Sequence, residues 1–282
     1  MVSNIMTKYP FPFLKWAGGK QQLISIFIHY FPKTYNKYIE PFVGGGAVFF
    51  HLRPQKAILM DINSELINCY NVIKNDYKKL IGKLKNHKQK HNKQYYYKVR
   101  AWDREQNWEL HFEDIERASR FIYLNKTCYN GLYRVNKKGE FNVPFGRYKN
   151  PRIFDEWNLK ICSKFLQQTV LYCDDFTRCL EFAEKDDLIY LDPPYVPISP
   201  TANFVEYSEK GFSFEDQIRL FYMFLELDKH GCKLMLSNSY SKSIIELYQP
   251  YGYKILEITA NRKISSNPKK RNNVKEVLIL NY

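Results

Sequence analysis

Short apolar runs alternate with longer polar, helix-like segments at both ends of the chain. The runs that we interpret as strands lie at 38–39, 57–60, 169–173, 188–191, 233–237 and 274–280. A helix is predicted after the first of them, at 47–50. Alternation of short buried strands with helices is typical of an α/β fold built on a largely parallel sheet.

The middle of the chain lacks this alternation. Residues 74–100 contain nine Lys and one Arg against a single acid, Asp76, and no β-rich run. We expect helices and loops there. Aromatic and polar residues then mix through 125–148, where Gly131 and Gly139 are expected at turns. The pattern therefore predicts one α/β domain interrupted by a basic insert from about residue 64 to about residue 165.

The composition of the chain indicates what kind of partner it binds. The chain has 282 residues, a formal net charge of +14 and 17% aromatic residues, including 23 Tyr and 20 Phe. A basic, Tyr-rich chain favours a polyanionic partner with bases on which side chains can stack. The alternative is a Lys-, Asn-, Ile- and Tyr-rich composition inherited from an AT-rich genome.

Features that the sequence lacks disfavour several classes of protein. No apolar run reaches the about 18 residues that a membrane span needs, and residues 1–12 contain no signal-peptide core. The six cysteines form no C-x-x-C pair, which argues against a zinc site or a disulfide scaffold. We therefore expect reduced thiols, no metal, no membrane association and a cytoplasmic location.

Asp192-Pro193-Pro194-Tyr195 directly follows the apolar run 188–191. Loops beyond the carboxyl ends of strands are where open α/β sheets bind ligands. A carboxylate and a proline carbonyl could each accept one N–H of an exocyclic amine such as that of adenine, which would free the nitrogen lone pair. An aromatic ring could stack on an extruded base. The alternative is a Pro-rich turn with an acid that faces solvent.

A second motif suggests an adenosine-containing cofactor. The glycine-rich turn 41–46 follows a predicted strand, and Asp61 ends the next one, where an acid commonly binds ribose hydroxyls. Phe49 stands where a dinucleotide fingerprint needs its third glycine, and Leu14 and Gln21 break the P-loop pattern around residues 13–20. A structural turn and a helix-capping acid explain the turn and Asp61 about as well.

Together these segments resemble the Dam family of S-adenosylmethionine-dependent DNA adenine-N6 methyltransferases over nearly the whole chain. The resemblance lies at 13–20, 40–49, 61–64, 129–148, 192–204 and 262–275. The runs 139–148 and 201–204 are especially specific to such proteins. The family implies a Rossmann-like methyltransferase sheet with an inserted, mostly helical DNA-recognition domain that carries a β-hairpin. We expect the catalytic domain at 1–63 and 166–282 and the target-recognition domain at 64–165.

The resemblance also implies roles for individual residues. S-adenosyl-L-methionine would be bound by Trp16, Lys20, Phe42, Gly44, Asp61, Asp175, Phe176 and Asp192. Asp174 directly precedes Asp175, so the match between Asp175 and the acid of the family could be shifted by one residue. The catalytic motif would be Asp192, Pro193, Pro194 and Tyr195, in which Asp192 and the Pro193 carbonyl accept the target amine and Tyr195 stacks on the flipped base.

For DNA recognition, residues 129–134 resemble the hairpin of the family. The implied DNA-reading residues are Lys15, Tyr129, Asn130, Leu132, Arg134 and Pro144. Arginine is well matched to O6 and N7 of guanine, and apolar side chains to the thymine methyl group. Agreement with the branch that reads GATC predicts methylation of adenine in 5′-GATC-3′. A phosphate clamp is the alternative for Arg134.

Double-stranded DNA is the expected partner, contacted through phosphates by residues 74–98 and 262–271, and the loop 261–273 is expected to be mobile until DNA orders it. We expect a monomer in a bacterium or encoded by a phage, with a restriction endonuclease that acts on the same site as a further partner. An amine methyltransferase acting on RNA or a protein amide, and a catalytically inactive DNA-binding protein, are the competing interpretations.

Overall fold

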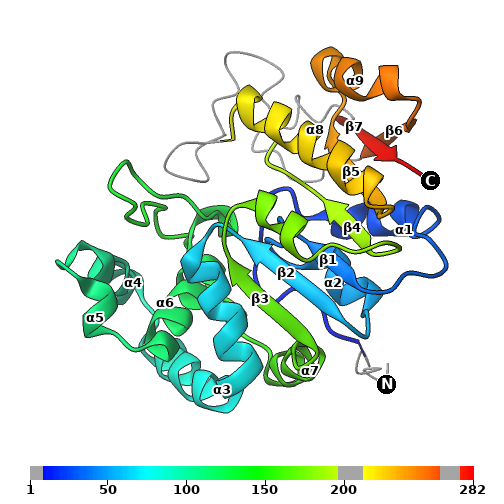
Figure 1. Ribbon diagram of the computed structural model, residues 1–282. Helices are drawn as coiled ribbons and strands as arrows, with labels where there is room; N and C mark the ends of the chain where they lie inside the picture. Colours follow the sequence, from blue (N-terminus) through cyan, green and yellow to red (C-terminus); the bar gives the residue numbers. More distant parts are fainter. Residues whose placement is uncertain (1–8, 196–211, 261–273) are drawn as a thin grey trace, which may run out of the picture. The chain divides into compact units, whose positions relative to one another are not determined.

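The computed structural model describes residues 9–195, 212–260 and 274–282, and its described strands form one seven-stranded sheet (Figure 1). The order across the sheet is β3-β2-β1-β4-β5-β7-β6. The strands are β1 Tyr38–Glu40, β2 Ala57–Asp61, β3 Thr169–Cys173, β4 Leu188–Leu191, β5 Lys233–Ser239, β6 Lys254–Ala260 and β7 Val274–Leu280. Each predicted strand is present. Strand β6 was not predicted.

The central strands of the sheet are parallel. Strand β1 pairs in parallel with β2 and β4, and β4 with β5, whereas β7 runs antiparallel to both β5 and β6. All four residues of β4 are buried, as expected for a strand covered on both faces. The structure thus confirms the α/β class and the mostly parallel, Rossmann-like sheet.

The chain divides into two compact units. The first contains Met1–Gly19, Gly44–Arg53 and Asn63–Leu171, and the second Lys20–Val43, Pro54–Ile62 and Tyr172–Tyr282. Helices of the first unit are α2 Ala47–Leu52, α3 Ser64–Lys90, α4 Lys93–Arg100, α5 Trp108–His111, α6 Asp114–Thr127 and α7 Glu156–Leu166; those of the second are α1 Ile24–Phe27, α8 Phe214–Lys229 and α9 Lys242–Tyr248. Short 3-10 helices occur at Lys20–Gln22, Ala101–Arg104, Tyr129–Gly131, Phe176–Glu181 and Gln249–Tyr251.

Helices α3 and α4 cover most of residues 74–100, where the absence of β-rich runs predicted helices and loops. Asn63 caps the N-terminus of helix α3, and its side chain accepts a hydrogen bond from the Leu66 backbone N–H at 3.0 Å. Helix α3 packs against α6 and α7 within the unit. The predicted domain limits of 64–165 were drawn from composition, and the role of this segment in target recognition stays a prediction.

The second unit has its core between the sheet and the helices α8 and α9. Ile189 and Leu191 of β4 pack into this core together with Leu220 and Phe224 of α8, which runs alongside β4 and β5 in Figure 1. Because side chains alternate along a strand, Tyr190 faces the other way. Its ring contacts Phe27 of α1 edge to face at a centroid distance of 6.3 Å. The end of β4 is therefore supported on both faces.

Within the described ranges, no helix is long and apolar enough to cross a membrane, and no group of three or more His, Cys, Asp or Glu side chains could hold a metal ion. All six cysteines lie in these ranges as free thiols, and Cys173 is the exposed one.

Candidate active site and DNA-reading surface

Asp192 is the first residue after β4, and it is held through one of its two carboxylate oxygens. Lys20 Nζ lies 2.8 Å from Oδ1, and the Ser237 hydroxyl of β5 donates to the same oxygen at 2.8 Å. The Tyr190 hydroxyl lies 3.0 Å from Ser237 Oγ and can donate to it in turn. In the part of the chain that the structure describes, Oδ2 receives no hydrogen bond. One oxygen is therefore fixed and the other can accept a ligand N–H.

Burial and charge act in opposite directions on this carboxyl group. The Asp192 side chain is 18% exposed, and burial raises its pKa above the usual value because the charged form loses solvation. The Lys20 ammonium lowers the same pKa, the charge of Glu276 raises it, and the net direction is upward. Lys20 therefore does most to preserve the charged carboxylate.

Tyr195 is tied to a residue that the sequence analysis did not select. Its hydroxyl donates to Glu276 Oε2 of β7 at 2.7 Å. Lys20 Nζ lies 3.7 Å from the same oxygen and 4.6 Å from the centre of the Tyr195 ring. The sequence signal for Glu276 was an acid within the mostly apolar run 274–280, and the structure shows that it is buried, with 8% of its surface exposed.

The carbonyl groups of the two prolines in the motif differ in their hydrogen bonding. The Pro194 carbonyl accepts a hydrogen bond from Gln217 Nε2 of α8 at 3.2 Å. No hydrogen bond to the Pro193 carbonyl is present among residues 9–195, 212–260 and 274–282. The Pro193 carbonyl, predicted to help Asp192, therefore remains available as an acceptor.

Three phenylalanine rings cluster in the same unit. The centroid of Phe42 lies 5.2 Å from that of Phe176 and 5.8 Å from that of Phe212. Asp61 is the last residue of β2, where an acid can accept hydrogen bonds from ribose hydroxyls. Aromatic faces combined with carboxylates fit an adenosine group, whose base can stack and whose hydroxyl and amine groups donate.

The two neighbouring acids after β3 have different partners. Asp174 pairs with Arg178 at 2.6 Å, whereas Asp175 Oδ1 accepts from the Thr177 N–H at 3.1 Å and from Arg219 Nη2 of α8 at 2.9 Å. The Arg219 guanidinium also lies 4.9 Å from the centre of the Phe176 ring. Arg219, which the sequence analysis missed, therefore joins the predicted acid to the predicted aromatic residue.

In the first unit, the backbone of the glycine-rich turn meets a tryptophan. Gly44 has a φ of +47°, and a Cβ atom there would lie 2.6 Å from Trp16 Cδ1. The Gly44 carbonyl accepts a hydrogen bond from the Tyr70 hydroxyl at 2.9 Å. The Trp16 ring stacks on Tyr133 at a centroid distance of 5.6 Å. Trp16 therefore lies directly against the backbone of the turn, and the cofactor roles of Trp16 and Gly44 stay predictions.

Lys15 and the turn at Gly131 come together although they are far apart in sequence. The Asn125 side chain of α6 accepts from Lys15 N–H and donates to Lys15 C=O, both at 2.8 Å. A Cβ atom at Gly131, where φ is +65°, would lie 2.8 Å from Lys15 Cβ. Lys15 Nζ lies 4.7 Å from the centre of the Tyr148 ring. Glycine is therefore required beside the stem of Lys15.

Residues 134–142 form a short antiparallel hairpin. Asn142 N–H donates to the Arg134 carbonyl at 3.0 Å, and Val135 bridges Phe141. The exposed Arg134 side chain donates through Nε to Asn142 Oδ1 at 2.7 Å. Its two Nη groups have no partner in the described part of the chain. The guanidinium group is thus oriented while its Nη groups are available.

The other predicted DNA-reading residues lie just before and after this hairpin. Tyr129 is 48% exposed, and Asn130 has a left-handed conformation with a φ of +56°. Leu132 is half-buried, and the exposed Pro144 accepts the Tyr129 N–H at 2.8 Å through its carbonyl. Their predicted contacts with bases stay predictions.

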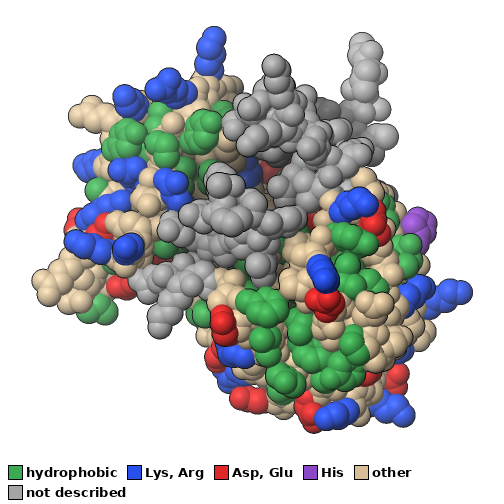
Figure 2. Space-filling model, turned by 90° about the horizontal axis from the view of Figure 1, so that it is seen from above, with side chains coloured by type: hydrophobic (Ala, Val, Ile, Leu, Met, Phe, Trp, Pro, Cys, Tyr) green, Lys and Arg blue, Asp and Glu red, His purple; other side chains and the backbone are tan. Residues whose placement is uncertain are grey.

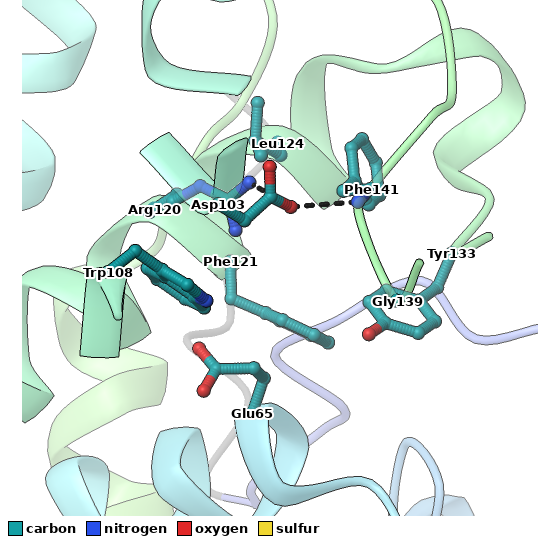
Figure 3. Close-up of a pocket in the computed structure, with 9 residues that line it drawn as sticks. All are labelled: Glu65, Asp103, Trp108, Arg120, Phe121, Leu124, Tyr133, Gly139 and Phe141. Carbon is teal, nitrogen blue, oxygen red and sulfur yellow. Dashed lines mark hydrogen bonds and ion pairs between the residues drawn. The ribbon is translucent and has the colours of Figure 1, made fainter. Parts of the chain in front are cut away.

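A buried ion pair anchors the hairpin to the helices of its unit (Figure 3). Asp103 Oδ2 lies 2.6 Å from Arg120 Nη2 of α6 and accepts the Phe141 N–H at 2.8 Å. The side chains of Asp103 and Arg120 are 5% and 4% exposed. They line a cavity of about 30 Å³, which has room for about two water molecules. Tyr133 and Phe141 border the cavity from the hairpin side.

Basic side chains gather on the surface. The face in Figure 2 shows Lys and Arg side chains close together at the upper left. In α3 and α4, four lysines have partners: Lys74 bonds the Thr169 carbonyl, and Lys79, Lys83 and Lys85 pair with acids. The exposed lysines that have no acidic partner among the described residues are Lys78, Lys88, Lys90, Lys93 and Lys98. Some predictions concern residues outside the described ranges. They are phosphate binding by the loop 262–271, mobility of 261–273 and the resemblance to the family at 201–204.

Comparison with known proteins gives consistent matches over most of the chain. A family model described as D12 class N6 adenine-specific DNA methyltransferase matches residues 16–264. The Type II methyltransferase M.MjaIII of Methanocaldococcus jannaschii is 46% identical over 96% of this chain and 99% of its own length. Type II methyltransferase M1.LlaDCHI of Lactococcus lactis subsp. cremoris is 43% identical over 96% of this chain and 95% of its own. A DNA adenine methylase of Haemophilus influenzae is 38% identical over 95% of this chain and 93% of its own length.

Proposed function

The chain belongs to the D12 class of N6 adenine-specific DNA methyltransferases, which use S-adenosyl-L-methionine, and we propose that it methylates a flipped adenine in 5′-GATC-3′. The observation that carries the chemical part of the proposal is the arrangement at Asp192. Lys20 and Ser237 both hold Oδ1, while Oδ2 can accept an amine N–H.

In the proposed reaction, the protein makes the adenine nitrogen a better nucleophile. Asp192 Oδ2 accepts one N6–H, and the Pro193 carbonyl accepts the other. These two bonds draw the nitrogen toward tetrahedral geometry and release its lone pair from the ring. The Asp192 carboxylate also stabilises the positive charge that develops on nitrogen. Stacking of the base on Tyr195 would hold it outside the duplex.

The cofactor, when bound, supplies a methyl group on a positively charged sulfur that leaves as a neutral thioether. The task of the protein is therefore mainly positioning, which can contribute about 7–11 kcal/mol when reacting groups are well aligned. We propose that Phe42 and Phe176 bind the adenine ring of the cofactor, that Asp175 accepts from its amine, and that Asp61 accepts from its ribose. Their aromatic and acidic character in one unit supports this assignment.

The proposed GATC recognition rests on Arg134 and Lys15. The Arg134 Nη groups could donate to O6 and N7 of one guanine while Asn142 holds Nε. Lys15, supported by Asn125 and Gly131, would donate to another guanine, and Leu132 and Pro144 would contact the thymine methyl group. Relatives named DNA adenine methylase support DNA as the substrate.

We further propose that one chain acts as a monomer on double-stranded DNA in the cytoplasm. A restriction endonuclease that cuts the same site is a proposed partner, because two of the relatives are named Type II methyltransferases.

The test is transfer of labelled methyl groups to short duplexes that differ by one base pair within GATC. Labelling of adenine only in the intact site is the expected result. Labelling in another sequence would retain the reaction and refute the assignment of the hairpin. Preferential labelling of RNA or of a protein amide would refute DNA recognition, and failure to bind cofactor would indicate an inactive DNA-binding protein.

A further inference from the structure

Glu276 is a buried acid on β7 that contacts two residues of the candidate active site. On the neighbouring strand β5 its register partner is Ser239, and β5 lies between β7 and β4. Glu276 Oε2 accepts the Tyr195 hydroxyl at 2.7 Å and lies 3.7 Å from Lys20 Nζ. Its side chain is 10% exposed.

The contact with Tyr195 limits how its ring can move. A phenol ring after two prolines could rotate about its side-chain bonds, but a hydrogen bond from its hydroxyl to a carboxylate is charge-assisted and short. Burial and the charges of Asp192 and Glu276 raise the pKa of Tyr195 well above the usual value, so its hydroxyl remains a donor. The orientation of the ring is therefore coupled to Glu276.

The contact with Lys20 links Glu276 to Asp192. The Lys20 ammonium lies between Asp192 Oδ1 and Glu276 Oε2, so two buried carboxylates share one buried cation. The titratable groups around Asp192 in the described part of the site are Lys20, Glu276 and the hydroxyls of Tyr190 and Tyr195. Loss of the Glu276 charge would remove one of these two carboxylates, and with it one of the influences that raise the pKa of Asp192.

We propose that Glu276 is a positioning residue for methyl transfer, which holds the Tyr195 ring through its hydroxyl and places Lys20 beside Asp192 Oδ1. This inference rests on the proposed roles of Asp192 and Tyr195. It assigns the last strand of the sheet a part in orienting the base-stacking ring and the catalytic carboxylate. Glu276 itself does not contact the reacting atoms in this proposal.

The experiment compares the full-length chain with the variants Glu276→Ala, Glu276→Gln, Tyr195→Phe and the double variant Glu276→Ala/Tyr195→Phe. Rates of single-turnover methyl transfer to a GATC duplex are measured together with the dissociation constants of cofactor and DNA. The control is Glu257→Gln on β6, because Glu257 is an exposed acid that pairs with Lys275. Thermal unfolding of each variant establishes that it is folded.

We expect Glu276→Ala and Tyr195→Phe each to slow methyl transfer about tenfold, with both dissociation constants nearly unchanged. The double variant should be no slower than the slower single variant, because both changes break the same hydrogen bond. Glu276→Gln keeps an oxygen acceptor for Tyr195 but loses the charge, and it should retain most of the rate at neutral pH. The acidic limb of its pH–rate profile should move to lower pH, since Glu276 raises the pKa of Asp192.

Multiplicative losses in the double variant would refute the link through Tyr195. An unchanged acidic limb in Glu276→Gln would refute the link to Asp192, and this variant also serves if Glu276→Ala does not fold. Failure of the proposed function has a different signature: the unchanged protein itself would then not methylate the GATC duplex. Failure of the role of Asp192 would show as methyl transfer retained in Asp192→Asn, whatever the Glu276 variants do.

Discussion

Lys20 Nζ lies 2.8 Å from Asp192 Oδ1, although Lys20 precedes the first strand of the sheet and Asp192 follows β4. The Lys20 side chain is 4% exposed, so the ion pair is shielded from solvent. A buried ammonium at this distance lowers the pKa of the Asp192 carboxyl group and so opposes the upward effect of burial. The pair thus relates the N-terminal segment to the catalytic motif.

Replacement of Asp192 by Asn should slow methyl transfer strongly but preserve DNA binding. Asn keeps the size of the side chain but loses the charge that stabilises the developing ammonium, so we expect single-turnover methyl transfer to fall about 10²–10³-fold. DNA affinity, measured by titration, should remain close to that of the unchanged protein. Rapid methylation by the variant would contradict the proposed role of Asp192.

Replacement of Lys20 by Met should make methyl transfer more sensitive to acid. The Lys20 ammonium lowers the pKa of Asp192, so its loss lets burial raise that pKa further. The reactive form is the carboxylate, and the rate should therefore decline at a higher pH than in the unchanged protein. The pH–rate profile measures this shift. The control, Lys229→Met, removes an exposed lysine of α8 and should leave the acidic limb in place.

Replacement of Arg134 by Ala should relax recognition of one base pair. Loss of a bidentate contact to guanine should cost about 1–3 kcal/mol at that position. Competition between GATC and single-substituted duplexes measures the loss. Lys138→Ala removes an exposed lysine of the same hairpin and should weaken binding to all sequences alike. If Arg134→Ala behaved in the same way, Arg134 would be a phosphate clamp.

Replacement of Asp103 by Ala should destabilise the first unit and loosen the hairpin. The change leaves Arg120 buried without its acid and the Phe141 N–H without its acceptor. Breaking a buried ion pair typically costs about 3–5 kcal/mol. Urea unfolding measures this cost, and Asp114→Ala, which removes an exposed acid of α6, is the control. An unchanged free energy of unfolding would show that the ion pair does not anchor the hairpin.

His87 should make the first unit labile in acid. It is 4% exposed, stacks on Tyr123 and hydrogen-bonds with Tyr95, and burial lowers its pKa from 6.5 to about 4. Between these two values the unfolded chain binds a proton that the folded chain does not. Stability should therefore fall as the pH decreases from 6.5 to about 4, by up to about 3 kcal/mol.

The measurement for His87 is urea unfolding at pH 7.5 and 4.5. The variant His87→Gln should show a weaker dependence on pH than the unchanged protein, whereas His29→Gln, at an exposed position, should not. Equal pH dependence in all three proteins would exclude His87 as the cause.

The sequence alone determined the strands whose apolar character is local. The run 188–191 coincides with β4, and all four of its residues are buried, because a strand covered on both faces needs continuous apolar side chains. Strand β6 escaped prediction because it is an edge strand in which Lys254 and Glu257 interrupt the apolar pattern. The motif at Asp192 and the resemblance to a family could likewise be recognised from the sequence, since both depend on short consecutive segments.

Only the tertiary structure decided which side chains support those motifs. Glu276 and Ser237 reach the loop after β4 because β7 and β5 follow β4 in the sheet, an order that residue patterns do not encode. Arg219 meets Asp175 because of the placement of α8. Periodicity reports which face of an element is buried, whereas the partners across that face depend on how elements far apart in the chain pack together.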